Sequence, residues 1–334
     1  MLDFLFLPWL AKPLWMWLAF ISLVLVLLAF DLGVLHRKNR ELGLAESLWL
    51  SVFYVAVAIS YGGAIWWAYG RGLITTTDGT HAGMTFFTGY FLEKMLSIDN
   101  VFVISLIFGY FAIPRKYQYR ALLWGILAVI VLRGLMIGFG AALVQRHDWV
   151  LLLFGAFLVF TGLRMLFAEE REPDIARNPV VRFLKRYMHV SDRLYGDRFF
   201  VREKDIRTGR MVIVATPLFL ALAVINVADL IFAVDSVPAI FAITTDTYIV
   251  YTANIMAILG LRALYFALAA MVHRFHYLQY ALALVLVFIG AKVFWTHVFG
   301  KVDPAISLGV TLAIVAGGVL FSIWRTARMD HPSH

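Results

Sequence analysis

The chain has 334 residues, of which 62% are hydrophobic and 15% charged, and its formal net charge is +8. Soluble domains are nearer half apolar and a quarter charged, so this composition excludes an ordinary soluble domain and predicts a polytopic membrane protein. The absence of cysteine excludes disulfides, thiolate metal sites and cysteine nucleophiles.

Nine segments are long and apolar enough to be membrane spans, because a spanning helix needs about 20 mainly apolar residues. We therefore predict an all-α protein with nine transmembrane helices. These segments cover residues 13–34, 47–69, 84–111, 120–144, 149–167, 211–242, 249–272, 277–299 and 304–324. The first of them runs into the basic segment 36–40 and not into a small-residue cleavage site, so we expect a span and not a cleaved signal peptide.

Lysine and arginine are distributed unequally over the two sides of these spans. One side collects most of them, including those of the connector 168–210, and the other has only Lys12, Arg71, Arg146 and Lys301. The positive-inside rule makes the basic side cytoplasmic. We expect the N-terminus outside, the C-terminus inside, and a net charge that orients the chain and does not bind nucleic acid.

The connector 168–210 is the one long soluble segment that the sequence predicts. Its mixture of basic, acidic and aromatic residues favours a solvated linker between two halves, with a short amphipathic helix over 179–188 as a further option. It is also the segment where we would expect soluble protein partners to bind, if the protein has any.

An internal repeat relates two groups of three spans. LEKMLSIDNVFVI (92–104) aligns with ADLIFAVDSVPAI (228–240), and the next two spans continue the match as 126–136 on 255–265 and 158–166 on 286–294. Since three is odd, the copies would cross the membrane in opposite directions. This inverted-topology repeat is typical of transporters with a substrate site at mid-membrane.

The repeat divides the chain into five regions. They are an N-terminal two-helix region (1–70), a first three-helix repeat (84–167), the basic connector (168–210), a second three-helix repeat (211–299) and a C-terminal helix (304–324).

Charged residues inside these spans fall on each other in the alignment. Glu93 matches Asp229, Asp99 matches Asp235, and Arg133 matches Arg262. An ionised side chain at mid-membrane costs about 2.5–3.5 kcal/mol on insertion scales, so a pair of acids kept in both copies indicates a function. The alternative, a duplication for packing alone, would explain the repeated glycines and not the acids.

The ligands on offer are carboxylate, amide and hydroxyl oxygens, which suit Mg²⁺, Ca²⁺ and Mn²⁺. A helix turns 100° per residue, so the acids six residues apart do not share a face. Either the helix unwinds, for which Thr216–Pro217 and Pro238 make the sixth span the better candidate, or one acid binds the ion while the other meets an arginine. The candidate metal ligands are Glu93, Asp99, Asn100, Asn226, Asp229 and Asp235. The supporting residues are Asp31, Arg133 and Arg262. No partner is assigned to Lys94. Asp31 lies at the cytoplasmic end of the first span, and taken by itself it is expected to be an interfacial residue.

The pieces FDLGVLHRK (30–38), LEKMLSIDNVFVI, ADLIFAVDSVPAIFAITTD (228–246) and LGLRALYF (259–266) resemble, in this order, the TerC family of integral membrane proteins. The resemblance implies divalent metal homeostasis, chiefly Mn²⁺ export from the cytoplasm through the bacterial inner membrane. It assigns the family's acids to Glu93, Asp99, Asp229 and Asp235, and the DLG motif to Asp31. Asn226 stands where the family often has a further acid.

The function expected from the sequence is export of divalent cations, Mn²⁺ first, with proton exchange as an option. One alternative is transport of Ca²⁺ or protons in pH homeostasis. Another is a membrane scaffold for protein partners, in which the acids are structural. No catalytic motif stands out, so we expect neither an enzyme nor a resident cofactor.

Overall fold

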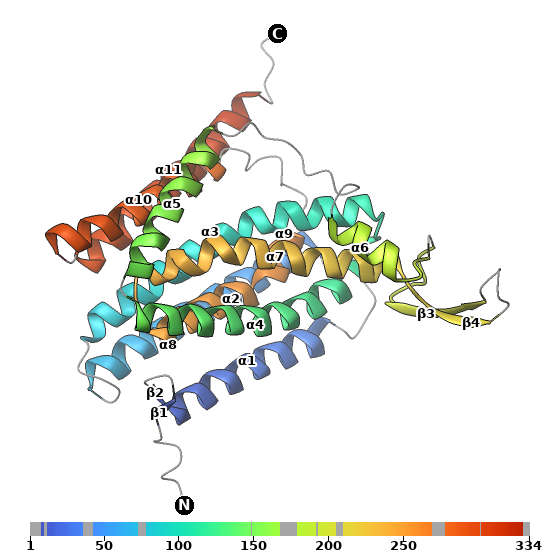
Figure 1. Ribbon diagram of the computed structural model, residues 1–334, viewed down its shortest axis with the longest axis horizontal. Coiled ribbons are helices and arrows are strands. Elements are labelled where there is room, and N and C mark those ends of the chain that lie inside the picture. Colours follow the sequence, from blue (N-terminus) through green and yellow to red (C-terminus); the bar gives the residue numbers. More distant parts are fainter. Residues whose placement is uncertain are drawn as a thin grey trace, which may run out of the picture.

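The computed structural model is a bundle of long helices with a small hairpin at one end (Figure 1). It describes residues 8–9, 12–35, 43–72, 78–147, 149–167, 179–191, 193–204, 210–268, 278–300 and 302–329. The basic segment 36–40 and the first part of the predicted connector, 168–178, lie outside these ranges.

The helices of the described ranges are α1 (Leu14–Leu35), α2 (Leu44–Gly70), α3 (Gly79–Tyr110), α4 (Arg115–Arg146), α5 (Trp149–Phe167), α6 (Pro179–Tyr187), α7 (Pro217–Phe241), α8 (Thr247–Leu259), α9 (Leu261–Leu268), α10 (Leu278–Phe299) and α11 (Pro304–Met329). Two antiparallel hairpins accompany them. They pair β1 (Pro8–Trp9) with β2 (Lys12–Pro13), and β3 (Phe200–Lys204) with β4 (Met211–Ala215).

Eight stretches of the described chain are long and apolar enough to cross a membrane, namely α1, α2, α4, α5, α7, α8 together with α9, α10 and α11. This confirms the predicted class, an all-α polytopic membrane protein. The 32-residue α3 is not among the eight, because its most apolar stretch carries three charged residues, Glu93, Lys94 and Asp99. A ninth crossing by α3 stays a prediction.

The predicted start of the sixth span was wrong. Residues 211–215 form β4, which pairs with β3, and α7 begins only at Pro217. Proline suits the first turn of a helix, since the N–H that it lacks would have no partner there. The connector is therefore not only a linker, because it contributes strand β3 of this hairpin as well as α6, which matches the amphipathic helix expected over 179–188.

The predicted seventh span, 249–272, is broken at Gly260 into α8 and α9. The break frees the carbonyl oxygen of Ala257, and Lys94 of α3 donates to it over 3.2 Å. A Cβ on Gly260 would lie 2.8 Å from Lys94 Nζ and 3.1 Å from Tyr54 Cβ, so the glycine makes room for this contact. Lys94 thus acquires the partner that the sequence did not assign.

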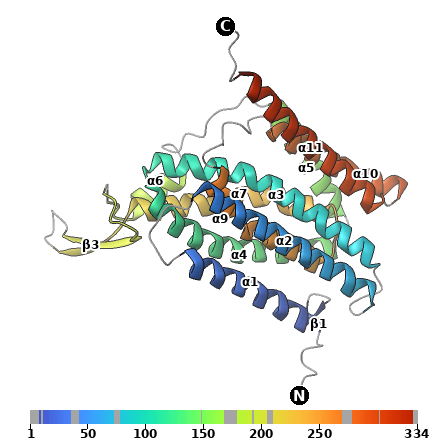
Figure 2. The same cartoon turned by 180° about the vertical axis from the view of Figure 1, so that it is seen from behind.

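The helices form two groups that lean against each other. In Figures 1 and 2, α5, α10 and α11 are inclined to the other long helices, which run nearly side by side. Among the contacts, α4 packs on α7, α8 packs on α3, and α5 packs on α10. The second helix of each predicted repeat therefore packs on the first helix of the other, as an inverted repeat would require, although the repeat itself stays a prediction.

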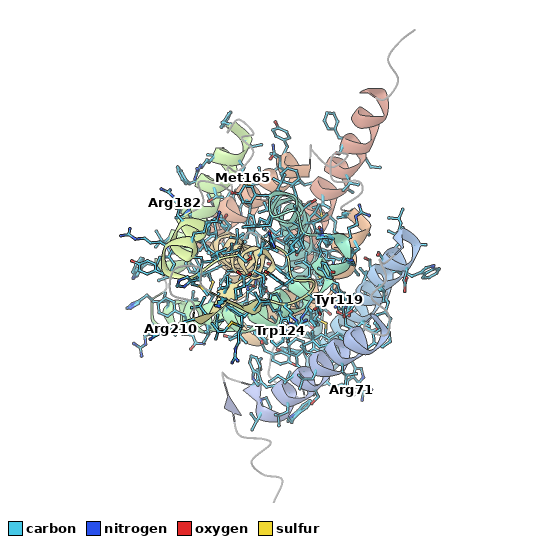
Figure 3. All side chains as sticks on the ribbon, turned by 90° about the vertical axis from the view of Figure 1, so that its right-hand side faces the viewer. Arg71, Tyr119, Trp124, Met165, Arg182 and Arg210 are labelled. Atoms are coloured by element: carbon cyan, nitrogen blue, oxygen red, sulfur yellow. The ribbon has the colours of Figure 1, made fainter. Side chains whose placement is uncertain are left out.

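One end of the bundle carries α6 and the hairpin β3–β4 beside the last turn of α3 and the first turns of α4 and α7. We call it the connector end. Figure 3 looks at the molecule from this end, with the basic residues Arg182 and Arg210 at the rim. The site described next lies along the bundle between this end and the opposite one.

Candidate ion site

Two acids meet one arginine in the interior of the bundle. Glu93 lies near the middle of α3 and Asp229 near the middle of α7, and their residues are 0% and 8% exposed. Arg133 enters from α4 and is 1% exposed. Ionised groups taken out of water this far need a partner of opposite charge, so the three side chains depend on one another.

Arg133 uses its whole guanidinium group on this cluster. Its Nε donates to Asp229 Oδ2 and its Nη2 to Asp229 Oδ1, each over 3.1 Å, which is a bidentate pair. Its Nη1 donates to Glu93 and also lies 3.1 Å from Ser236 Oγ and 3.2 Å from Asn254 Oδ1. If both acids are ionised, the cluster carries one net negative charge.

Two amides extend the cluster. Asn254 on α8 donates through Nδ2 to Glu93 Oε2 over 3.1 Å, and Asn100 on α3 lies with its Nδ2 3.5 Å from Asp229 Oδ1. Asn254 was missed by the sequence analysis. A signal was present, since Asn254 is an amide in the middle of an otherwise apolar predicted span.

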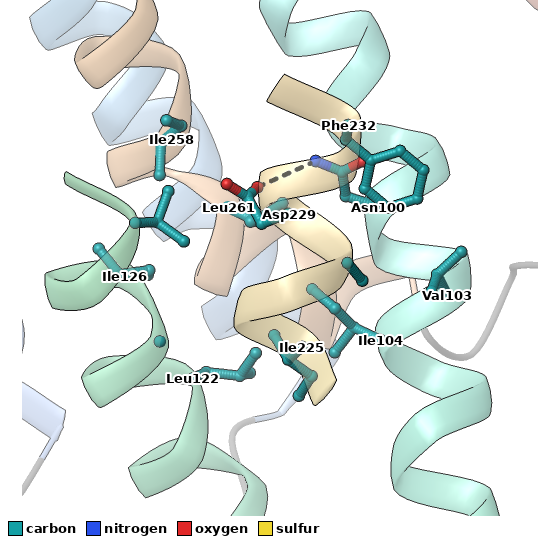
Figure 4. Close-up of a pocket in the computed structure, with 13 residues that line it drawn as sticks. Asn100, Val103, Ile104, Leu122, Ile126, Ile225, Asp229, Phe232, Ile258 and Leu261 are labelled. Carbon is teal, nitrogen blue, oxygen red and sulfur yellow. Dashed lines mark hydrogen bonds between the residues drawn. The ribbon is translucent and has the colours of Figure 1, made fainter. Parts of the chain in front are cut away.

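A small cavity adjoins Asp229 on the side of the connector end (Figure 4). Its volume is about 20 Å³, room for one water molecule or one dehydrated ion. Asp229 and Asn100 supply its polar groups, while the remaining walls are apolar. They are formed by Val103, Ile104, Leu122, Gly125, Ile126, Val129, Ile225, Ala228, Phe232, Ile258 and Leu261.

Two amide oxygens near this cavity are buried and have no hydrogen-bond partner among the described residues. They are Oδ1 of Asn100 and Oδ1 of Asn226. A Cβ placed on Gly125, which lines the cavity, would stand 3.7 Å from Asn226 Oδ1. A buried acceptor without a donor is unfavourable, so both oxygens are available to a cation.

The structure does not gather all the predicted ligands. Asp235 is half-buried on α7 and points to α5, where Thr161 Oγ1 lies 3.5 Å from its Oδ1. The side chain of Asp99 lies outside the described part of the structure. Within the described ranges, no three His, Asp or Glu side chains come close enough to hold a metal ion. An ion at Asp229 would need amide oxygens to complete its ligands.

The second predicted arginine makes a different pair. Arg262, at the start of α9, is ion-paired through Nη2 with Asp31 of α1, and its guanidinium lies 4.3 Å from the centre of the Tyr119 ring. Asp31 is only 4% exposed, so it is buried against Arg262, while its position at the membrane interface stays a prediction. Of the two alternatives for acids six residues apart, unwinding of the sixth span is not seen, because α7 is one helix from Pro217 to Phe241. Among the described residues, Arg133 pairs with the first acid of each copy, Glu93 and Asp229.

These features define a polytopic α-helical membrane protein with an ionisable cluster in its interior. The family model of the "Integral membrane protein TerC family" matches residues 78–330. The chain belongs to the TerC family.

Its relatives align along nearly their whole length. An "Uncharacterized membrane protein" of Rickettsia bellii is 41% identical over 94% of this chain and 99% of its own. The "Putative membrane-bound redox modulator Alx" of Photorhabdus laumondii is 41% identical over 92% of this chain and 94% of its own. The protein of the same name from Escherichia coli K12 is 40% identical over 94% and 96%. No solved structure matches the chain.

Proposed function

We propose that the protein exports divalent metal cations from the cytoplasm, with Mn²⁺ as the first candidate, in exchange for protons. The observation that carries this proposal is the acid–arginine cluster beside a cavity near which two buried amide oxygens have no partner in the described part of the chain. Acids in the middle of membrane helices are expensive, and they commonly mark the path of an ion. Carboxylate and amide oxygens suit a hard or borderline cation.

Arg133 supplies the positive charge when no ion is bound. A divalent cation at Asp229 would compete with the bidentate contact of Arg133, which could then keep Glu93, Ser236 and Asn254 as acceptors. Protons would serve the same purpose at the two carboxylates. An ion, the arginine and protons can thus each compensate negative charge at the site, and exchange between these three is the mechanism that we propose.

Two other functions remain as proposals. Transport of Ca²⁺ or protons in pH homeostasis would use the same oxygens. A scaffold role would use the hairpin β3–β4, whose Met211 and Ile213 are 65% and 64% exposed at the connector end. The name of the Alx relatives refers to redox modulation, and a cysteine-free chain has no thiol with which to contribute to it directly.

The cavity offers a mild test of the ion site. Gly125→Ala would add a methyl group 3.7 Å from both Asn226 Oδ1 and Leu222 Cδ1, which is ordinary contact, so the protein should fold. Because the cavity holds about one ion, we expect Mn²⁺ affinity of the purified protein to fall about tenfold or more. Gly138→Ala on the same helix is the control, since nothing lies within 4 Å of its added methyl.

Transport itself is measured as Mn²⁺ uptake into everted membrane vesicles, with and without a pH gradient. Uptake that Gly125→Ala reduces and Gly138→Ala does not would support the proposal. A wild-type protein that binds no Mn²⁺ and carries none would overturn it. Ca²⁺ in parallel assays separates the two ions, and protein partners retained without any ion movement would favour the scaffold.

A further inference from the structure

The two matched arginines are used unequally. Arg133 has acceptors for Nε, Nη1 and Nη2, whereas the Nη1 of Arg262 is buried without a hydrogen-bond partner among the described residues. Both are 1% exposed. An inverted repeat gives each side chain a counterpart in the other half, so this inequality describes one state of the molecule and not its symmetry.

The alignment of the two repeats predicts the acceptors of Arg262 in a conformation where each repeat has the contacts that the other has here. Arg133 contacts Glu93, Asp229 and Ser236. The counterparts of these three acceptors are Asp229, Glu93 and Asn100. Asn100 Oδ1 is one of the buried oxygens that has no partner within the described chain. A donor without an acceptor and an acceptor without a donor thus occupy positions that the repeat relates to each other.

The packing beside the acids also differs between the side of the connector end and the opposite side. The cavity toward the connector end is lined by Ile126 of α4. Its counterpart toward the opposite end is Ile255 of α8, which is 0% exposed. There a Cβ on Gly89 would already stand 3.4 Å from Ala253 Cβ and 3.6 Å from Ile240. The side toward the connector end thus has a cavity beside the acids, and the side of Ile255 shows ordinary van der Waals contact.

The chain also has a joint where Arg262 would need to move. The break at Gly260 lies two residues before it, whereas α4 runs without interruption past the equivalent position, Val131. Because α9 is a short separate helix, it can turn relative to α8 without breaking hydrogen bonds inside either one.

We propose that Arg262 is the second counter-charge of the acid pair. In a second conformation it leaves Asp31 and donates to Glu93, Asp229 and Asn100, while Arg133 withdraws and the cavity opens toward the opposite end. The inference rests on the proposed transport function, and it makes Arg262 a positioning residue of the ion site. Each arginine binds the acids in one of the two conformations, so one of the two negative charges is compensated in both.

The test measures which side of the acids is open, without any metal. The chain has no cysteine, so Ile126→Cys or Ile255→Cys would each be its single thiol, at equivalent positions and replacing the same residue type. The rate of reaction with 2-aminoethyl methanethiosulfonate is measured on the purified protein. In the otherwise unchanged chain, we expect the thiol at 126 to react faster than the thiol at 255.

Two pairs of substitutions should shift the ratio of these rates in opposite directions. Arg262→Gln removes one ion pair seen here and three contacts of the proposed second conformation, and Asn100→Leu removes one long contact of 3.5 Å seen here and a full acceptor of Arg262 there, so the ratio of 126 to 255 should rise. Arg133→Gln and Ser236→Ala remove contacts seen here. They should therefore lower the ratio of the rate at 126 to the rate at 255 by about tenfold, as expected when the populations of two conformations shift. The neutral pair, Asn100→Leu and Ser236→Ala, answers the question even if an arginine variant does not fold.

Equal rates at the two thiols in the unchanged chain would overturn the inference. So would Arg262→Gln and Asn100→Leu leaving the ratio within twofold, or a shift in the same direction for both pairs. If the two pairs shift the ratio in opposite directions but the protein binds no Mn²⁺, the exchange of arginines is supported and only Mn²⁺ as the transported ion is refuted. Unchanged ratios in a protein that binds Mn²⁺ would keep the ion site and remove the exchange.

Discussion

At the scale of single residues, one nitrogen of the Arg133 guanidinium has more acceptors within reach than hydrogens to donate. Its Nη1 has two hydrogens, yet Glu93, Ser236 and Asn254 all lie within reach as acceptors. One acceptor is therefore always spare, and the arginine can move between partners at small cost. Losing the arginine entirely is different, because breaking a buried ion pair by removing one partner commonly costs about 3–5 kcal/mol.

Asn226→Asp tests the electrostatics of the site directly. It places a third carboxylate where an amide oxygen near the cavity has no partner among the described residues, while Arg133 still binds the acid pair. A more negative site attracts a divalent cation more strongly, so we expect Mn²⁺ affinity to rise about tenfold, the equivalent of about 1.4 kcal/mol.

Mn²⁺ binding to the purified variants measures this change. Asp229→Asn should weaken binding, and Asn226→Asp combined with it should restore part of the loss. Unchanged affinity in both single variants would mean that these side chains do not face the ion.

At the scale of elements, the contact between α5 and α10 depends on glycine. Gly155 and Gly162 of α5 face α10, and Gly290 of α10 faces α5, so the two backbones approach closely. A Cβ on Gly290 would lie 2.6 Å from the carbonyl oxygen of Gly155 and 2.9 Å from the nitrogen of Val159. Small residues at a helix contact are the usual means of close packing in a membrane, where lipid is as apolar as the helices.

Gly290→Ala should therefore force α5 and α10 apart. The atoms that its methyl group would meet are largely backbone, which cannot turn away, so we expect a loss of about 1–3 kcal/mol in stability. Thermal unfolding followed by the fluorescence of the ten tryptophans measures it. Gly317→Ala on α11 is the matched control, because nothing lies within 4 Å of its added methyl. Equal midpoints for the two variants would show that α5 and α10 can separate at no cost.

At the scale of the whole molecule, the two predicted repeats hold each other together. The contacts of α4 with α7 and of α8 with α3 both join one repeat to the other. The acid cluster has the same character, since α3 and α4 supply Glu93 and Arg133 while α7 and α8 supply Asp229 and Asn254. Neither repeat could form this site alone.

Topology is the prediction at this scale. The excess of lysine and arginine on one side predicts a cytoplasmic connector end. A reporter fused after Arg328 should read as cytoplasmic, and one inserted near Thr77, between α2 and α3, as external. Alkaline phosphatase and green fluorescent protein fusions distinguish the two sides. Both reporters on one side would remove the ninth crossing by α3, and with it the inverted repeat.

Helices and the charge cluster were predictable from the sequence because each carries a local signal. Long apolar runs gave the crossing helices, and the aligned charges singled out Glu93, Asp229 and Arg133 before the structure brought them together. The hairpin was not predictable in this way, since MVIVA (211–215) continues directly into the apolar sequence of α7 and reads as part of it.

The contacts between side chains on different helices could not be predicted from the sequence either. Helical spacing shows which face of a helix a side chain occupies, and it does not show which neighbour that face meets. Arg262 with Asp31, and Lys94 with the carbonyl of Ala257, join elements far apart in the chain. The break at Gly260 was equally hidden, because glycine is common inside membrane helices that do not break.

The charged residues of the cluster are synthesised in order along the chain, so each enters the membrane before or after its partner. Glu93 and Arg133 belong to consecutive helices, so α3 and α4 can leave the translocon as one hairpin whose acid is already neutralised. Asp229 then arrives to an arginine in place. Asp31 must wait for Arg262, and its position four residues before the end of α1 lets it stay among the lipid head groups until then. We expect biogenesis to depend more on Arg133 than on Arg262, because only Arg133 is needed while the first repeat is still alone in the bilayer.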